Sequence, residues 1–224
     1  MTTAALPQRP DPATVHRVIV LPGLWMPAAS MAWFASRLRG LGFDARTLGY
    51  RSLRDGAARV IDALDAALRQ GPAHLVGHSL GGVVALETLH QRGAGSVGRV
   101  VCIGSPLCGS RAARTLRARA VTAAYLGRSG PLLERGCAQW PDGVEVGMIA
   151  GTRPRGLGGL VARFQEPHDG TVAVRETRAP GLADHLLLPA SHTGLMFDAR
   201  AVAQTARFLR QGRFGDAEDA SGAV

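Results

Sequence analysis

The chain has 224 residues, of which 46% are apolar, and carries a formal net charge of +9. This length suits one domain with a core and a cleft, and no stretch approaches the roughly 20 apolar residues of a membrane helix. All 26 basic residues are arginine and are spread along the chain. Their densest group, Arg111 to Arg119, lacks the interleaved aromatic residues that stack on bases. We therefore expect a soluble protein with no nucleic-acid partner and no stable membrane insertion.

The two ends of the chain differ in composition from its middle. Residues 1–14 are rich in Pro and Ala, without a basic segment leading into an apolar run, and predict a flexible N-terminal segment of a cytoplasmic protein. Residues 212–224 lack periodicity and predict a disordered tail, which leaves 15–211 as the domain. The three cysteines form no CxxC pair, and no phosphate-binding glycine loop or metal-ligand cluster is visible. No cofactor and no metal are expected.

Short β-branched runs alternate with longer helical patterns along the chain. Strands are predicted at 17–21, 43–48, 73–77, 99–103, 144–150 and 184–188, and helices at 30–39, 54–69, 80–91, 110–124 and 195–210. Ser30 and Ser110 are candidate N-caps. In 54–69 an apolar stripe recurs at helical spacing: Val60, Ile61, Leu64 and Leu68. The alternation predicts an α/β fold, with a mostly parallel sheet of about six strands and helices on both faces.

One motif carries chemistry: Gly77-His78-Ser79-Leu80-Gly81-Gly82. It closes the strand 73–77 and opens the helix 80–91, the setting that a serine nucleophile on a sharp turn requires. The glycines supply the lack of bulk that such a turn needs. A glycine-rich turn without chemistry is the alternative. The motif resembles the nucleophile elbow of α/β-hydrolases, bacterial lipases and esterases especially, and the resemblance extends over residues 16 to 210.

The resemblance implies that Ser79 is the nucleophile and that the acid and then the base follow it along the chain. A serine hydroxyl needs a base, and the base needs an orienting group. His192 lies after the last predicted strand, in a segment similar to the His-x-Gly-Leu of small bacterial lipases. We predict that it is the base, against the alternative of a surface histidine at a helix entry. His78 is expected to point away from the serine.

The acid should lie between Ser79 and His192. The eligible carboxylates are Asp142, Glu145, Glu166, Asp169, Glu176 and Asp184. Asp169, followed by Gly170, resembles the Asp-Gly segment that carries the acid in many bacterial lipases, and it follows the predicted strand 144–150. We therefore predict Asp169 as the acid; an ordinary turn aspartate is the alternative.

The same resemblance implies that the backbone N–H groups of Leu24 and Leu80 form the oxyanion hole. Pro22 departs from the family, which often has His-Gly in this loop, but it leaves the N–H of Leu24 intact. Trp25 and Met26 are expected to wall an acyl pocket, or else to pack the loop.

Leu107 is expected to line the same pocket. It lies in the segment 105–110, Ser-Pro-Leu-Cys-Gly-Ser, which is similar to the Thr-Pro-x-x-Gly-Ser loop of lipase relatives. The connection that follows is longer than one crossover helix needs and is too apolar for disorder. Residues 107–143 could therefore form a small cap beside Ser79, with Leu132 and Leu133 toward the acyl chain. The alternative is that these side chains only cover the sheet.

The sequence thus predicts a serine hydrolase that cleaves carboxylic esters, of small molecules or lipids, through a Ser-His-Asp triad and an acyl-enzyme. An acyltransferase, thioesterase or amidase would use the same triad. A binding domain without catalysis is the alternative from another class; against it, all three triad residue types occur in the required order. The substrate and the oligomeric state stay open.

Overall fold

The computed structural model describes residues 10–50, 56–118, 124–137, 139–155 and 164–216. Six strands form one sheet in the order β2-β1-β3-β4-β5-β6, and every neighbouring pair is parallel. The strands are β1 (Arg17–Leu21), β2 (Asp44–Thr47), β3 (Ala73–His78), β4 (Val97–Ile103), β5 (Glu145–Gly151) and β6 (Asp184–Leu188). The predicted fold class is confirmed.

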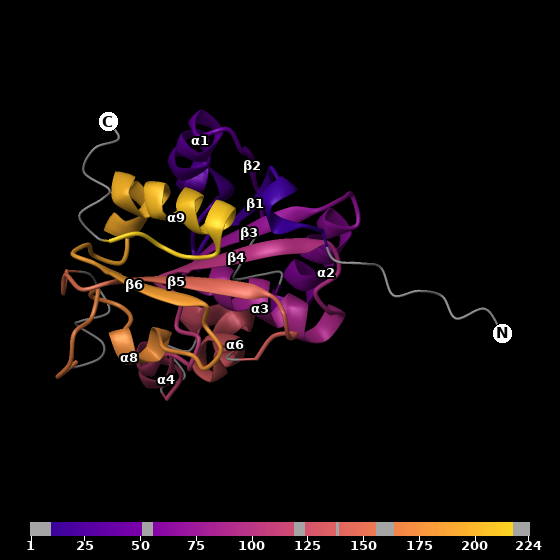
Figure 1. Ribbon diagram of the computed structural model, residues 1–224. Coiled ribbons are helices and arrows are strands. Elements are labelled where there is room, and N and C mark those ends of the chain that lie inside the picture. The colour runs from indigo at the N-terminus through magenta and orange to yellow at the C-terminus, as the bar shows by residue number, and fades with distance from the viewer. Residues whose placement is uncertain (1–9, 51–55, 119–123, 138, 156–163, 217–224) are drawn as a thin grey trace.

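Helices cover both faces of the sheet (Figure 1). On one face lie α1 (Ala32–Gly40) and α9 (Ala199–Gln211). On the other lie α2 (Gly56–Leu68), α3 (Leu80–Arg92), α4 (Arg111–Arg117), α6 (Gly130–Arg135) and α8 (Val174–Thr177). The short 3-10 helices are η1 (Pro12–Thr14), η2 (Ala28–Met31), η3 (Ala124–Ser129) and η4 (Gly194–Phe197). Each face has its own apolar core, and the stripe predicted in α2 is buried in one of them.

One of the two predicted N-caps is present, and the other serine bonds a different backbone group. Ser110 caps α4 as expected, since its Oγ accepts from the N–H of Ala113 at 3.1 Å. Ser30 does not cap α1; its hydroxyl donates to the carbonyl of Pro27 at 2.7 Å inside η2. The helix predicted at 195–210 is divided in two, because Asp198 caps a new helix, α9, after η4.

The described residues include positions on both sides of the predicted limits of 15 and 211. Asp11 caps η1 through the N–H of Ala13 at 2.9 Å. Phe214 is buried, with its ring 4.8 Å from that of Phe208. The rest of the two predicted end segments, 1–9 and 217–224, lies outside the described residues.

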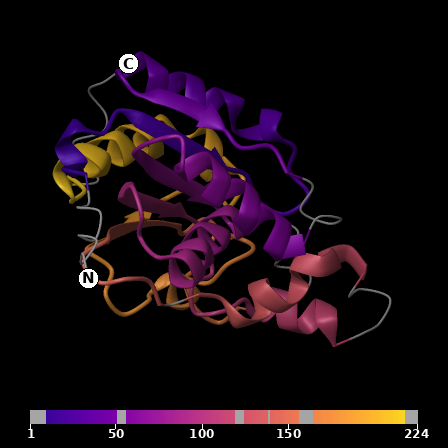
Figure 2. The same ribbon diagram turned by 90° about the vertical axis from the view of Figure 1, so that its right-hand side faces the viewer.

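The segment 107–143 forms α4, η3 and α6, which pack on one another and lie beside α2 (Figure 2). Leu132 and Leu133 are buried in the core cluster shared with α2 and α3. An ion pair joins the segment to α3, with Arg135 3.0 Å from the buried Glu87. These two leucines therefore contribute to the core, and a cap over the acyl site stays a prediction. Within the described residues, no helix combines the length and apolar content needed to cross a bilayer.

Candidate active site

Ser79 lies at the turn between β3 and α3 in a conformation that residues other than glycine rarely adopt, with φ 53° and ψ −118°. The turn needs its glycines. A Cβ on Gly77 would lie 2.3 Å from the nitrogen of Gly82, and one on Gly81 would lie 2.3 Å from the carbonyl oxygen of Leu21. Ser79 makes no side-chain cap to α3 and is partly exposed, whereas the residues before and after it are buried. The turn thus leaves the Ser79 side chain partly accessible between a strand and a helix that are themselves buried.

Asp169 and His192 are in direct contact. Nδ1 of His192 lies 2.7 Å from Oδ2 of Asp169, and the backbone N–H of His192 donates to the Asp169 carbonyl at 2.9 Å. The other carboxylate oxygen, Oδ1, accepts from the backbone N–H groups of Thr171 at 2.8 Å and Val172 at 2.7 Å. The carboxylate is therefore held by three donors in one orientation.

These contacts also decide the charge of the carboxyl group. Asp169 is 1% exposed, and burial by itself would raise its pKa. The charge and hydrogen bond of His192, together with the two backbone amides, outweigh burial and hold the pKa below its usual value. The side chain that faces His192 is thus a carboxylate at neutral pH.

The three predicted residues follow three different parallel strands, whose carboxyl ends share one edge of the sheet. Ser79 follows β3, Asp169 follows β5 and His192 follows β6. Gly104, at the end of β4, lies between them: a Cβ there would be 3.2 Å from Nδ1 of His192 and 3.3 Å from Oδ2 of Asp169. The strand order therefore places Ser79 at the same end of the sheet as the contact between Asp169 and His192.

His78 belongs to this cluster, although no role was predicted for it. Its ring lies 4.7 Å from the ring of His192, and its Nε2 lies 3.0 Å from the His192 backbone carbonyl oxygen. Because a carbonyl only accepts, Nε2 of His78 carries a proton and donates. Burial, followed by the charge of His192, lowers the pKa of His78 to about 3. A neutral His78 thus supports the backbone of His192; its place beside Ser79 in the motif was the available signal.

The loop after β1 lies against the Ser79 turn. A Cβ on Gly23 would be 3.3 Å from Cβ of Ser79, and the N–H of Met26 donates to the Gly23 carbonyl at 3.3 Å, which closes a turn around Leu24 and Trp25. Trp25 has φ 62°. Trp25 and Ser79 are the two residues other than glycine with positive φ in the described part of the chain.

Each of these strained residues adjoins one of the two predicted oxyanion donors. Leu80 is the first residue of α3, and the first N–H groups of a helix have no partner inside it. Leu24 directly precedes Trp25. Backbone strain that recurs at one place is typical of a functional site.

The predicted pocket residues differ in their surroundings. Trp25 is 52% exposed, and Met26 is half-buried against the core beside α1. Leu107 is fully buried in the core on the α3 face. An acyl pocket lined by these three residues stays a prediction.

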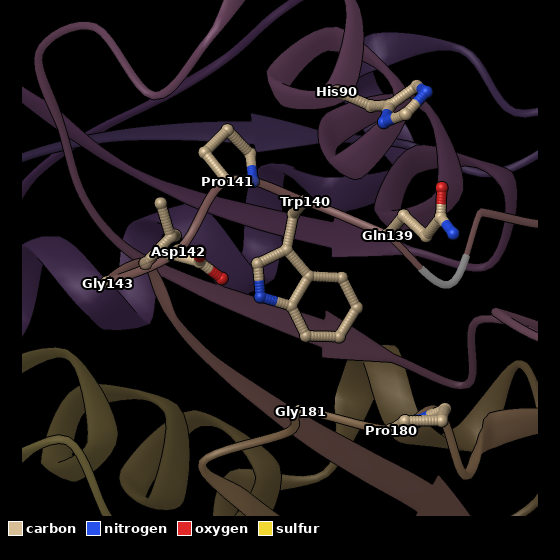
Figure 3. A pocket seen from close by; sticks show the side chains of 9 residues that line it. His90, Gln139, Trp140, Pro141, Asp142, Gly143, Pro180 and Gly181 are labelled. Carbon is tan, nitrogen blue, oxygen red and sulfur yellow. The ribbon is translucent and has the colours of Figure 1, made fainter.

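The other eligible carboxylates lie elsewhere or have other partners. Glu145 pairs with Arg99, Glu166 pairs with Arg111, and Glu176 accepts from backbone N–H groups at Arg111 and Ala173. Asp184 begins β6 and accepts from the N–H of Phe214 at 2.7 Å. Asp142 lines a hollow of about 600 Å³ with Trp140, His90 and Gly181 (Figure 3). Most of this lining comes from the residues that lead into β5 and β6. It therefore lies at the amino ends of the strands, opposite the carboxyl ends where Ser79 lies.

Known proteins resemble the chain in sequence and in fold. A family model described as the alpha/beta hydrolase family matches residues 18–210, and the chain belongs to that family. The N-formylmaleamate deformylase of Pseudomonas putida is 31% identical over 145 residues, which cover 57% of this chain and 53% of that protein. The chain therefore spans about half the length of this curated relative.

Solved structures share the fold at low identity. A lipase from Bacillus licheniformis has a TM-score of 0.67 at 18% identity, covering 92% of this chain and 94% of that one. An N-formylmaleamic acid deformylase from Pseudomonas putida has a TM-score of 0.59 at 15% identity, covering 87% and 92%. The predicted resemblance to α/β-hydrolases is confirmed, and a hydrolase is the class of protein that these comparisons indicate.

Proposed function

We propose that the chain is a serine hydrolase that cleaves carboxylic esters through Ser79, His192 and Asp169. The observation that most supports this proposal is the contact between Asp169 and His192 at the strand edge that carries the strained turn of Ser79. A hydroxyl, an imidazole and a buried carboxylate are the parts of a catalytic triad.

In the proposed reaction, Oγ of Ser79 attacks the ester carbonyl while Nε2 of His192 takes the hydroxyl proton. The N–H groups of Leu24 and Leu80 stabilise the negative oxygen of the tetrahedral intermediate. The intermediate collapses, the alcohol leaves with the proton from His192, and the acyl group stays on Ser79. Water then attacks the acyl-enzyme with His192 as the base, and the acid is released. Asp169 orients the imidazole and stabilises its positive charge throughout.

Cleavage of an amide C–N bond is the second candidate. The curated relative at 31% identity is named as a deformylase of N-formylmaleamate, a substrate with an N-formyl group. The same triad serves esters and amides, so the two activities differ in leaving group and not in the residues that act. A panel of 4-nitrophenyl esters, thioesters and N-formyl amides separates them by the ratio of kcat/KM.

Labelling with a fluorophosphonate tests the proposal, because the reagent reacts with an activated serine. We expect wild-type protein to label and to hydrolyse 4-nitrophenyl butyrate, and the Ser79→Ala variant to do neither. Ser30→Ala is the matched control: Ser30 is another partly exposed serine, whose described bond is to Pro27, and its loss should leave labelling unchanged. Labelling of the Ser79→Ala protein, or an inert wild-type protein, would reject the proposal.

A further inference from the structure

A second hollow, of about 380 Å³, lies beside the predicted base. Its lining comes from the chain that leaves β5, from the residues after β6 and from the start of α9. Its wall includes Ser191 and Gly194, which flank His192 in the sequence. Consecutive Cα atoms are about 3.8 Å apart, so this wall begins within about 8 Å of the His192 Cα atom.

Three arginines and one aspartate line this pocket, which gives it a positive charge. Arg200 is paired with Asp198 through two bonds of 2.6 and 3.1 Å, and these two charges cancel. Arg153 and Arg155 are exposed, and among the described residues no carboxylate pairs with either of them. Two guanidinium groups therefore remain for a ligand.

The backbone that carries these two arginines is tied to the loop of the base. The N–H of Arg153 donates to the Ala190 carbonyl at 3.1 Å, and the N–H of Arg155 donates to the Arg153 carbonyl at 2.8 Å. The second bond closes a three-residue turn around Pro154, whose ring fixes its φ. Both side chains thus start from a backbone that is already ordered, which lowers the entropy cost of binding.

The pocket also offers an apolar surface. Phe197 is 55% exposed, and Pro189 and Ala190 line the same hollow. The guanidinium groups of Arg153 and Arg155 beside the exposed ring of Phe197 suit a ligand with an apolar part and a terminal anionic group. Guanidinium groups bind carboxylate and phosphate oxygens in pairs, so these are the anions that fit.

We propose that this pocket binds the carboxylate or phosphate group of an anionic substrate while its ester lies at Ser79. This inference rests on the proposed function and names its substrate class. A group held at a distance from the reacting carbonyl binds equally in the ground state and in the transition state, so it lowers KM and leaves kcat unchanged.

Matched ester pairs test the inference. The mono-4-nitrophenyl esters of dicarboxylic acids of increasing length are compared with 4-nitrophenyl esters of uncharged acids of equal length. Acetate esters of hydroxycarboxylic acids test the alcohol side. We expect wild-type protein to prefer an anionic ester by about tenfold in kcat/KM, the range of a charge-assisted hydrogen bond. The preference should lie in KM and decrease with added salt.

The double variant Arg153→Gln/Arg155→Gln should lose this preference and keep its rate on uncharged esters. Arg46→Gln is the matched control: Arg46 is exposed and pairs with Asp44 on β2, at the other edge of the sheet, so its loss removes one charge and should change nothing. No preference at any length in either series, or a preference that survives in the double variant, would overturn the inference.

Direct binding separates this inference from the proposed function. Calorimetry with adipate and with inorganic phosphate is done on Ser79→Ala protein with and without the two arginine changes. If anion binding needs both arginines and wild-type protein also prefers anionic esters, the pocket is supported as a substrate site. Binding without any ester preference would overturn the substrate assignment. If wild-type protein neither labels nor hydrolyses esters, the proposed function fails; arginine-dependent binding then still supports the anion pocket, and its absence rejects that too.

Discussion

Replacing Asp169 by asparagine tests what the carboxylate does for His192. Oδ1 accepts the N–H groups of Thr171 and Val172, and the NH2 of an asparagine accepts no hydrogen bond. The asparagine oxygen must therefore keep this position, and its NH2 must face Nδ1 of His192. The imidazole can then only accept at Nδ1, its proton moves to Nε2, and it no longer takes the proton of Ser79.

The expected loss follows from this tautomer. In a Ser-His-Asp triad the wrong tautomer lowers kcat by about 10⁴-fold, which corresponds to about 5 kcal/mol of activation free energy. The fold should survive, because the two N–H bonds to Oδ1 and the side-chain volume are kept. Loss of the charged bond to His192 should lower the free energy of unfolding by about 1–3 kcal/mol.

Rates on 4-nitrophenyl butyrate measure the effect, and nitrogen NMR of His192 reports which ring nitrogen carries the proton. Asp142→Asn is the matched control. Asp142 is an exposed carboxylate near the amino ends of the strands, far from the carboxyl ends that carry the site, so the variant should keep full activity. An Asp169→Asn variant within tenfold of wild type, or an inactive Asp142→Asn variant, would refute the reasoning.

Three further changes test the fold around the site. Gly81→Ala should unfold the protein or lower its unfolding free energy by about 3 kcal/mol or more, because the added Cβ would lie 2.3 Å from the Leu21 carbonyl oxygen. Gly40→Ala is the control and should be tolerated, because an added Cβ there would have no atom within 4 Å. Urea unfolding compares the two variants. Burial lowers the pKa of His74 to about 4, so as pH falls from 6.5 toward 4 the unfolded chain takes up the proton first and stability is lost. The His74 share of this loss is about 2 kcal/mol at pH 5, and His78, whose pKa burial lowers to about 3, adds to it. His74→Gln should remove the His74 share and the exposed His90→Gln should not, measured by urea unfolding at neutral pH and pH 5. Leu133→Ala should lower the unfolding free energy by about 2–5 kcal/mol because Leu133 lies in the core; unchanged stability with a shifted preference between short and long esters would instead favour a cap.

Local patterns predicted most of the elements, because they depend on neighbours in the sequence. The short runs predicted as strands match all six strands to within about two residues at each end. The turn at Ser79 was local only in part: Gly77 is needed by backbone atoms of the same turn, whereas Gly81 is needed by the Leu21 carbonyl at the end of β1, a contact that depends on the packing of distant segments. Helix starts were less certain: the capping bond of Asp198 and the Ser30 bond to Pro27 depend on rotamers that a sequence does not display.

The sequence by itself therefore determined the order of strands and helices and the strand-turn-helix setting of Ser79, and it predicted Ser79, Asp169 and His192 as the residues of a triad. Only the tertiary structure showed which donors hold the Asp169 carboxylate, brought His78 against His192, and gathered Arg153 and Arg155 beside the same loop. The physical reason is that these contacts join residues after different strands. Their distances depend on the order of strands in the sheet and on the backbone amides that orient each side chain, and spacing along the chain encodes neither.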